Sequence, residues 1–318
     1  MSVSRRANYT GGSEPRRERF TIPLELAGAR LDRALAQLLP GESRSRLAKL
    51  IEQGHVRVDG ATAAGRLKLK SGEAVEVTLV PRPAEEGFRA EAIELAIVHE
   101  DDDILVVDKP PGLVVHPGSG NWAGTMLNAL LHHAPELERL PRAGIVHRLD
   151  KDTSGLLVVA RNESAQLDLV RQLQARTVKR TYLAIVRGRI AAAGTVEAPI
   201  GRHPVQRTRM AVVAGGKPAV THYRVREALA AGTLLQCDLE TGRTHQIRVH
   251  LASIGHPIVG DPTYKGPSTG SARTAVIGRQ ALHAWKLAFL HPRKGALVGF
   301  ESPMPDDMRA ALERLRES

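Results

Sequence analysis

The sequence is poor in several features that define common protein classes, and each shortage excludes something. It contains one cysteine, Cys237, in 318 residues, which excludes an internal disulfide framework and a zinc site built from cysteines. The apolar runs, such as those at 104–107 and 155–160, are far shorter than the roughly 20 residues that a helix needs to cross a bilayer. Residues 1–20 are polar and arginine-rich with no apolar segment behind them, so we expect no signal peptide and a cytoplasmic location.

Aromatic residues are also scarce, at 3 % of the chain, whereas 42 % of the residues are hydrophobic and 25 % are charged. The hydrophobic share is that of an ordinary globular protein with a real core. Modules that read single-stranded RNA stack bases on aromatic side chains, as RRM domains do. The shortage of aromatic residues argues against such a module.

Negative charge is in the minority, because 34 acidic residues face 45 lysines and arginines, for a net charge of +11. The excess is uneven: residues 141–318 carry +13, whereas residues 81–140 carry −7. The base composition of the genome could by itself raise the arginine count, without any functional reason. The uneven distribution nevertheless favours a polyanionic partner over a merely solvated surface, with the binding face in the second half of the chain.

The length predicts two domains joined by a linker. Residues 1–20 are expected to form a disordered basic arm. Residues 24–80 combine two short helical patterns, the second of them basic, with short alternating runs, which predicts a small α+β module. Residues 81–92 contain prolines and glutamates typical of a linker, and residues 93–318 form the second domain.

The second domain contains many short β-branched runs and fewer helical patterns. The helical patterns lie at 125–133, 164–175, 244–254 and 306–316. This proportion predicts an α+β fold, with a mixed, largely antiparallel sheet and flanking helices, and not a doubly wound parallel sheet.

Patterns for common cofactors and metals fail when they are tested one by one. Gly216 and Lys217 are followed by Pro218 where a phosphate-binding Walker loop requires serine or threonine. His245 and His250 are five residues apart, which does not place them on one helix face as a zinc pair requires. These segments therefore predict neither a Walker-type phosphate loop nor a paired-histidine zinc site.

One polar loop, between two expected strands in the segment 144–160, concentrates charged side chains. Within six residues it carries His147, Arg148, Asp150, Lys151 and Asp152. A carboxylate presented between cations is held ionised and can act as a nucleophile or a base. The same spacing also fits a turn in which aspartate and threonine side chains cap backbone amides.

Two further segments offer partners for this loop. A helix expected to open near Thr244 would bury a stripe of apolar side chains, at Ile247, Leu251 and Ile254. Arg248 lies beside that stripe, where a charge needs a partner, and Asp150 would supply one; the alternative is a surface arginine on the helix flank. Tyr182, one of four tyrosines, lies in a basic strand, where core packing is the alternative to a place in a site.

Together these segments resemble the catalytic motifs of the RluA-type pseudouridine synthases. The motifs are HRLDKDTSG at 147–155, RTY at 180–182 and TGRTHQIR at 241–248, and residues 24–80 resemble an S4-type RNA-binding domain. The resemblance spans residues 24–316. It departs from the family pattern in the basic arm and in Ser154, where close relatives often have threonine.

The resemblance implies an isomerase that converts uridine within RNA to pseudouridine without a cofactor or a metal. Asp150 would be the catalytic carboxylate, acting on the uracil ring or on the ribose C1′. Arg248 would pair with it, and Tyr182 would lie against the target base and help the final proton transfer. Arg148 would enter the RNA stack in place of the base that has left it.

The resemblance also implies a substrate. S4-bearing members modify large-subunit ribosomal RNA, and the segments 114–118, 202–204 and 216–223 resemble members that act on the helix 69 stem-loop of 23S rRNA. The expected partner is 23S rRNA or a large-subunit precursor, with no membrane partner and a monomeric enzyme. In the small module, the residues expected to bind RNA are Arg44, Arg46, Lys49 and Arg57. The alternatives are other 23S target sites, or a non-catalytic RNA-binding assembly factor.

Overall fold

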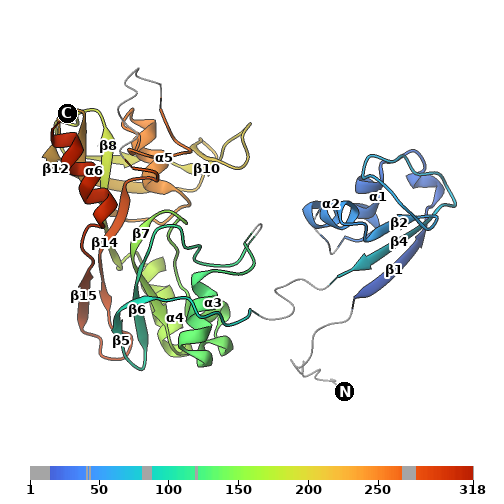
Figure 1. The fold of residues 1–318 in the computed structure, drawn as a ribbon, viewed down its shortest axis with the longest axis horizontal. Helices are drawn as coiled ribbons and strands as arrows, with labels where there is room; N and C mark the ends of the chain where they lie inside the picture. Colours follow the sequence, from blue (N-terminus) through green and yellow to red (C-terminus); the bar gives the residue numbers. More distant parts are fainter. Residues whose placement is uncertain are drawn as a thin grey trace. The chain divides into compact units, whose positions relative to one another are not determined.

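The computed structural model describes residues 15–40, 42, 44–80, 88–118, 121–266 and 277–317. They belong to two compact units, Met1–Phe88 and Arg89–Ser318 (Figure 1). The boundary falls within the linker expected at 81–92, of which 81–87 lies outside the described residues. None of the helices in the described ranges is long and apolar enough to span a membrane.

The first unit is a four-stranded antiparallel sheet packed with two helices. The strand order is β1-β4-β2-β3, with β1 at Arg16–Thr21, β2 at Val56–Val58, β3 at Ala61–Thr62 and β4 at Ala74–Leu79. The helices are α1 (Leu31–Leu38) and α2 (Arg44–Glu52), preceded by the 3₁₀ turn η1 (Leu24–Leu26). Apolar side chains of both helices and of β2 and β4 fill one core, as the alternating pattern predicts.

The expectation of a disordered arm over 1–20 is wrong for its last residues. Arg16–Thr21 form strand β1, which pairs antiparallel with β4 from Arg16 opposite Leu79 to Thr21 opposite Ala74. Four of these six residues are charged, because an edge strand exposes much of its surface to water. Phe20 supplies the apolar contact with the core. Residues 1–14 lie outside the described residues.

The second unit is built on a nine-stranded mixed sheet. The order is β5-β6-β7-β14-β8-β13-β12-β9, with β15 beside β14. The strands are β5 (Ala96–Glu100), β6 (Ile104–Lys109), β7 (Ser154–Ala160), β8 (Lys179–Arg187), β9 (Gly194–Glu197), β12 (Val220–Ala228), β13 (Gly232–Leu239), β14 (Leu282–Leu290) and β15 (Leu297–Glu301). Among these described strands, only β7 and β14 pair in parallel. The predicted mixed, largely antiparallel sheet is confirmed.

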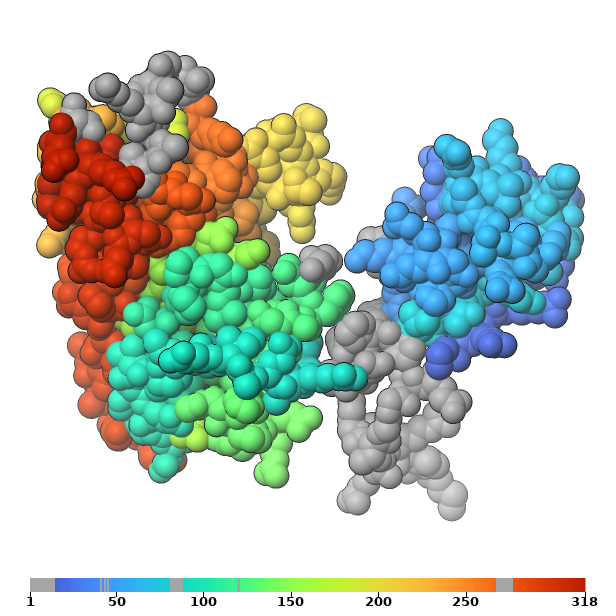
Figure 2. Space-filling view, viewed as in Figure 1, coloured from blue at the N-terminus to red at the C-terminus, as the bar shows by residue number. Residues whose placement is uncertain are grey.

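Four α-helices accompany this sheet, close to the four expected segments. They are α3 (Met126–His133), α4 (Glu163–Gln174), α5 (Gln246–Ser253) and α6 (Asp306–Arg316), with short 3₁₀ segments η2 (Pro135–Arg139) and η3 (Pro141–Gly144). Helix α4 contacts β7, whereas α5 contacts β12 and β11 (Met210–Val212). Strands β10 (Ile200–Arg202) and β11 (Met210–Val212) form a separate hairpin that projects from the rest of the unit (Figure 2).

The polar loop at 147–153 enters the sheet at its centre, because it leads directly into β7. All seven residues of β7 are buried. Gly155 pairs with Ala284 of β14, and a Cβ at Gly155 would lie 2.3 Å from the Ala284 carbonyl oxygen. Its φ of +110° is also one that glycine adopts without strain. Glycine at this position therefore allows the loop to approach the middle of the sheet.

Two local expectations about the site segments are wrong. No strand precedes the loop: η3 ends at Gly144 with φ +75°, and Ile145 makes only an isolated bridge to Val159. Helix α5 begins at Gln246, two residues later than expected, because His245 is in the left-handed region with φ 56°. Ile254, expected in the buried stripe, lies past the end of α5 and is 37 % exposed.

Candidate active site

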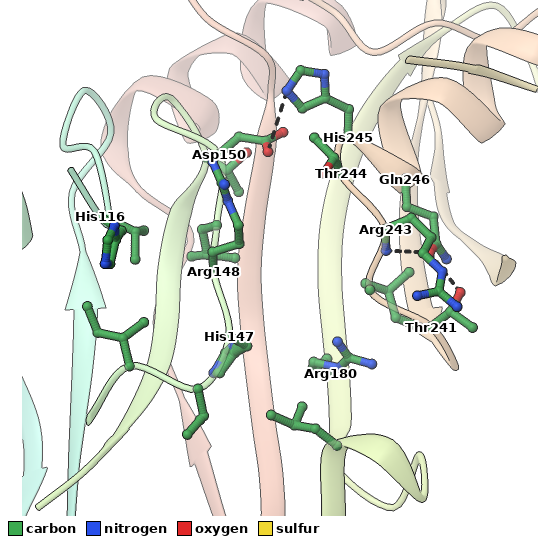
Figure 3. A pocket seen from close by; sticks show the side chains of 18 of the residues that line it. His116, His147, Arg148, Asp150, Arg180, Thr241, Arg243, Thr244, His245 and Gln246 are labelled. Atoms are coloured by element: carbon green, nitrogen blue, oxygen red, sulfur yellow. Dashed lines mark hydrogen bonds and ion pairs between the residues drawn. The ribbon is translucent and has the colours of Figure 1, made fainter. Parts of the chain in front are cut away.

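A cleft of about 990 Å³ opens in the second unit where the loop before β7, strand β8 and the start of α5 come together. Asp150, Tyr182 and Arg248 all line it, and so does Arg148. The three motifs, which lie far apart in the sequence, therefore meet around one cavity (Figure 3).

Arg248 joins two carboxylates at the base of this arrangement. Its Nη1 donates to Asp150 Oδ2 at 2.9 Å, and its Nε and Nη2 donate to the two oxygens of Asp261 at 2.7 and 3.0 Å. Burial by itself would lower the pKa of Arg248. The hydrogen bonds to Asp261 outweigh this effect, so the pKa of Arg248 is raised. Asp150 therefore faces a cation whose position is fixed by a bidentate pair on its other side.

Asp261, which the sequence analysis missed, organises this part of the site. Its side chain is completely buried. Besides pairing with Arg248, its Oδ1 accepts the backbone N–H groups of Thr263 and Tyr264 at 2.8 and 3.0 Å. The Tyr264 ring then lies 5.1 Å from the Arg248 guanidinium carbon, at cation–π distance. The only sequence signal was a Gly-Asp-Pro segment, which by itself indicates a turn.

His245 approaches Asp150 from the other side (Figure 3). Its Nε2 lies 3.8 Å from Asp150 Oδ1, and its Nδ1 lies 2.8 Å from the hydroxyl of Tyr264. That hydroxyl already accepts the Met210 N–H at 3.0 Å and has no other acceptor for its proton among the described residues. We assign the tyrosine as the donor to Nδ1, which places the proton of the neutral imidazole on Nε2, toward Asp150.

The charge state of this imidazole follows from its surroundings. Burial lowers the pKa of His245, and the positive charges of Arg248 and Arg148 act in the same direction. The carboxylates of Asp150 and Asp261 oppose this shift. The balance keeps His245 neutral at physiological pH, so Arg248 is the permanent cation beside Asp150.

Tyr182 lies on β8 with its side chain on the cleft wall. It is 7 % exposed, and its hydroxyl makes no hydrogen bond to any residue in the described ranges. Burial raises the pKa of Tyr182, although Arg180 acts against this shift. The phenol is therefore neutral and offers a proton and a flat face to a ligand in the cleft.

The residues predicted to bind RNA differ in their availability. Arg148 is exposed at the cleft and forms no ion pair with a described residue, and Arg44, Lys49 and Arg57 are exposed on the first unit. Arg46 differs from them. It is half-buried, its Nη2 donates to the Val80 carbonyl at 2.7 Å, and its Nε lies 3.3 Å from Glu42.

Lys109, also missed from the sequence, supports the loop that carries Asp150. It ends strand β6 and is fully buried. Its Nζ donates to the carbonyl oxygens of Pro110 at 2.7 Å, Leu113 at 3.0 Å and Lys151 at 2.8 Å. Because Lys151 directly follows Asp150, this ammonium group holds the backbone that presents the carboxylate. Burial lowers the pKa of Lys109 to about 7, against the opposing charge of Asp152.

Replacing Lys109 by methionine should therefore change stability in a pH-dependent way. In the folded protein the amine releases its proton near pH 7, whereas in the unfolded chain it keeps the proton up to its ordinary pKa of 10.5. Between these values the unfolded state binds more protons, so wild-type stability rises with pH relative to Lys109→Met, by up to roughly 1.4 kcal/mol per pH unit. Urea unfolding of both proteins at pH 7, 8 and 9 measures this difference, and a gap that stays constant would contradict the assignment.

One cluster among the described residues has the chemistry of a metal site, but it lies outside the cleft. Asp101, Asp103 and His291 have ligand atoms within 4.8 Å of one another. Both carboxylates already form ion pairs within the protein. Arg293 Nε lies 2.8 Å from Asp103, and Lys294 Nζ lies 3.2 Å from Asp101. This arrangement serves as an ion-pair network that ties β14 and its turn to the β5–β6 turn.

The fold and the ion pair of Asp150 with Arg248 in the cleft are features of one class of enzyme. Comparison with known families identifies this class. The family model for RNA pseudouridylate synthase matches residues 103–253, and the S4 domain model matches residues 29–75. Together with the relatives described next, these matches show that the chain belongs to the RNA pseudouridylate synthase family. It is an RNA pseudouridine synthase with an S4 domain, so the resemblance seen in the motifs is confirmed.

Named relatives show which pseudouridine synthases the chain is similar to. The chain is 60 % identical to ribosomal large subunit pseudouridine synthase D of Nitrosomonas europaea over 93 % of this chain and 87 % of the relative. It is 53 % identical to the protein of the same name from Pseudomonas aeruginosa, over 93 % and 95 %. Among solved structures, human RNA pseudouridylate synthase domain containing 1 is similar with a TM-score of 0.54 and 31 % identity, over 67 % of this chain and 85 % of the human one.

Proposed function

We propose that this enzyme isomerises specific uridines of 23S ribosomal RNA to pseudouridine, with Asp150 as the catalytic carboxylate. The observation that carries the proposal is the 2.9 Å contact between Arg248 and Asp150 on the wall of the cleft. The names of the similar proteins, which refer to the large ribosomal subunit, support the substrate. The S4 domain supplies a second surface for the same RNA, through exposed Arg44, Lys49 and Arg57.

In this proposal four side chains share the reaction. The target base has to leave its stack before its glycosidic bond can be reached, and Arg148, exposed on the same loop as Asp150, fills the space that it leaves. Asp150 then forms a transient bond, to the uracil ring or to the ribose C1′, while Arg248 holds the carboxylate in place. Tyr182 lies on the cleft wall, where the extruded base would rest.

The bonds balance without an external reactant. The bond from N1 to C1′ breaks, the uracil turns, and a bond from C5 to C1′ forms in its place. The transient bond to Asp150 breaks again, which regenerates the free carboxylate. The proton on C5 is released and N1 gains a proton, so the product is an isomer of the substrate. Tyr182, whose phenol is neutral because burial raises its pKa, stands where it can assist this proton transfer.

Within 23S rRNA, we propose the helix 69 stem-loop as the target, with the enzyme acting as a monomer in the cytoplasm, where this RNA is made. Purified enzyme should form pseudouridine in a helix 69 transcript and none in a 23S hairpin of equal length from another region. Mass spectrometry of nuclease fragments reads both reactions. If only the other hairpin were modified, the target would be a different 23S site and not helix 69. If neither were modified, the result would contradict 23S rRNA as the substrate.

A further inference from the structure

Arg180 is a buried cation that the protein itself leaves largely unsatisfied. It lies on β8, is 9 % exposed, and pairs with no carboxylate among the described residues. Its one side-chain hydrogen bond to a described residue runs from Nη2 to the Glu240 carbonyl oxygen, at 3.5 Å. Its Nε is buried and has no partner among the described residues. A guanidinium has five N–H donors, and burying its charge without an anion is unfavourable.

The side chain is turned into the active-site cleft. Residues 180 and 182 of a strand face the same side of the sheet, and both Arg180 and Tyr182 line the cleft. Figure 3 shows Arg180 among the lining side chains, together with His147 and Thr241. The N–H groups of Arg180 that lack a partner therefore lie at the cleft, where a bound substrate could reach them.

Neighbouring groups leave room for this guanidinium but supply no negative charge to it. A Cβ at Gly242 would lie 2.5 Å from Arg180 Nη1, so glycine makes the space. The Glu240 carboxylate is engaged elsewhere, 2.7 Å from His222 and 3.5 Å from Arg176. His147 is neutral, because burial and the charge of Arg180 lower its pKa to about 3.

We propose that Arg180 is a phosphate-binding residue whose ligand is a backbone phosphate of the substrate RNA next to the extruded uridine. This inference rests on the proposed function, since it takes the cleft to hold a nucleotide of RNA. Phosphate is the anion that every nucleotide carries, and the forked guanidinium matches its oxygens. Arg180 and Tyr182 are two positions apart on one strand, with Thr181 between them, so base and phosphate of neighbouring nucleotides reach them together.

Replacing Arg180 should weaken RNA binding without lowering the thermal stability of the protein. In Arg180→Met the free protein loses an uncompensated buried charge, so its thermal midpoint should stay the same or rise. RNA affinity should fall about 10-fold at moderate salt, and the slope of log affinity against log salt should shrink by about 0.7–0.9, the value for one phosphate contact. The rate at saturating RNA should change much less than the affinity.

Arg187→Met is the matched control. Arg187 lies on the same strand, is half-buried, and also has a buried Nε without a partner, but it does not line the cleft. Its replacement should leave both the RNA affinity and the salt slope unchanged. Arg180→Lys, which keeps one charge, should retain the slope with an affinity between those of wild type and Arg180→Met.

Wild-type isomerisation of the same RNA is measured in parallel, so that the two proposals fail separately. If the wild type forms pseudouridine and Arg180→Met shows the wild-type salt slope, the phosphate contact is refuted while the proposed function stands. A thermal midpoint of Arg180→Met well below that of wild type, with unchanged RNA affinity, would instead assign Arg180 a structural role. If the wild type does not modify the RNA, the proposed function itself fails.

Discussion

Asp150→Asn should abolish pseudouridine formation while the protein still folds and binds RNA. The amide has nearly the size of the carboxylate but lacks the charge that makes it a nucleophile, so the single-turnover rate should fall by about 10⁴-fold or more. RNA affinity should stay within about threefold, because the carboxylate makes no phosphate contact. Quench-flow measurement of pseudouridine formation, with filter binding of the same transcript, tests both statements.

Asp152→Asn is the control for this substitution. It removes one negative charge from the same loop, but Asp152 does not line the cleft. Its activity should therefore stay near that of the wild type. Equal losses in the two variants would show that the charge of the loop matters and not the position of Asp150, and substantial activity in Asp150→Asn would remove it from the chemistry.

Arg248→Met should be the second most damaging change, because it affects both stability and catalysis. It leaves Asp261, whose side chain is completely buried, without its cation. Removing one partner of a buried pair costs about 3–5 kcal/mol of unfolding free energy. Catalysis should fall by at least about 10³-fold, since Asp150 loses the group that fixes it. Urea unfolding and single-turnover rates measure the two effects.

A second substitution separates the two roles of Arg248. In Arg248→Met combined with Asp261→Asn the completely buried carboxylate is neutralised, and Asp150, which is partly open to the cleft, is the one carboxylate that loses its cation. Most of the lost stability should therefore return, whereas activity should not. Arg279→Met is a further control: it also breaks a bidentate pair, but its partner Asp307 is 43 % exposed and can be solvated. Its effect on stability should be smaller. Recovery of activity in the double variant would contradict the role of Arg248 beside Asp150.

The sequence was sufficient for the parts of the site that lie in contiguous motifs. Asp150, Tyr182 and Arg248 each stand in a run of residues whose spacing and resemblance placed them together, and the structure brings them to one cleft. The mixed sheet was predictable because β-branched runs outnumbered helical patterns. Their roles in catalysis stay predictions that the substitutions above test.

The residues that support the site could not be found in this way. Asp261 and Tyr264 act through contacts with Arg248, which precedes Asp261 by 13 residues. A Gly-Asp-Pro turn has the same pattern whether or not it binds an arginine. Lys109 ends an apolar run, where a charge looks like the surface end of a strand, yet its ammonium is buried against three carbonyl groups. Similarly, the RRERFT strand resembled a disordered arm because its pairing with β4 is visible only in three dimensions.

The central claim is that this chain makes pseudouridine in 23S rRNA through Asp150. It is tested most directly by mapping pseudouridines in 23S rRNA from cells that lack the gene and carry either the wild-type or the Asp150→Asn form. The account predicts that a defined set of sites disappears on deletion, returns with the wild-type form and stays absent with Asp150→Asn at equal protein level. Restoration of the same sites by Asp150→Asn, or an unchanged map after deletion, would contradict it.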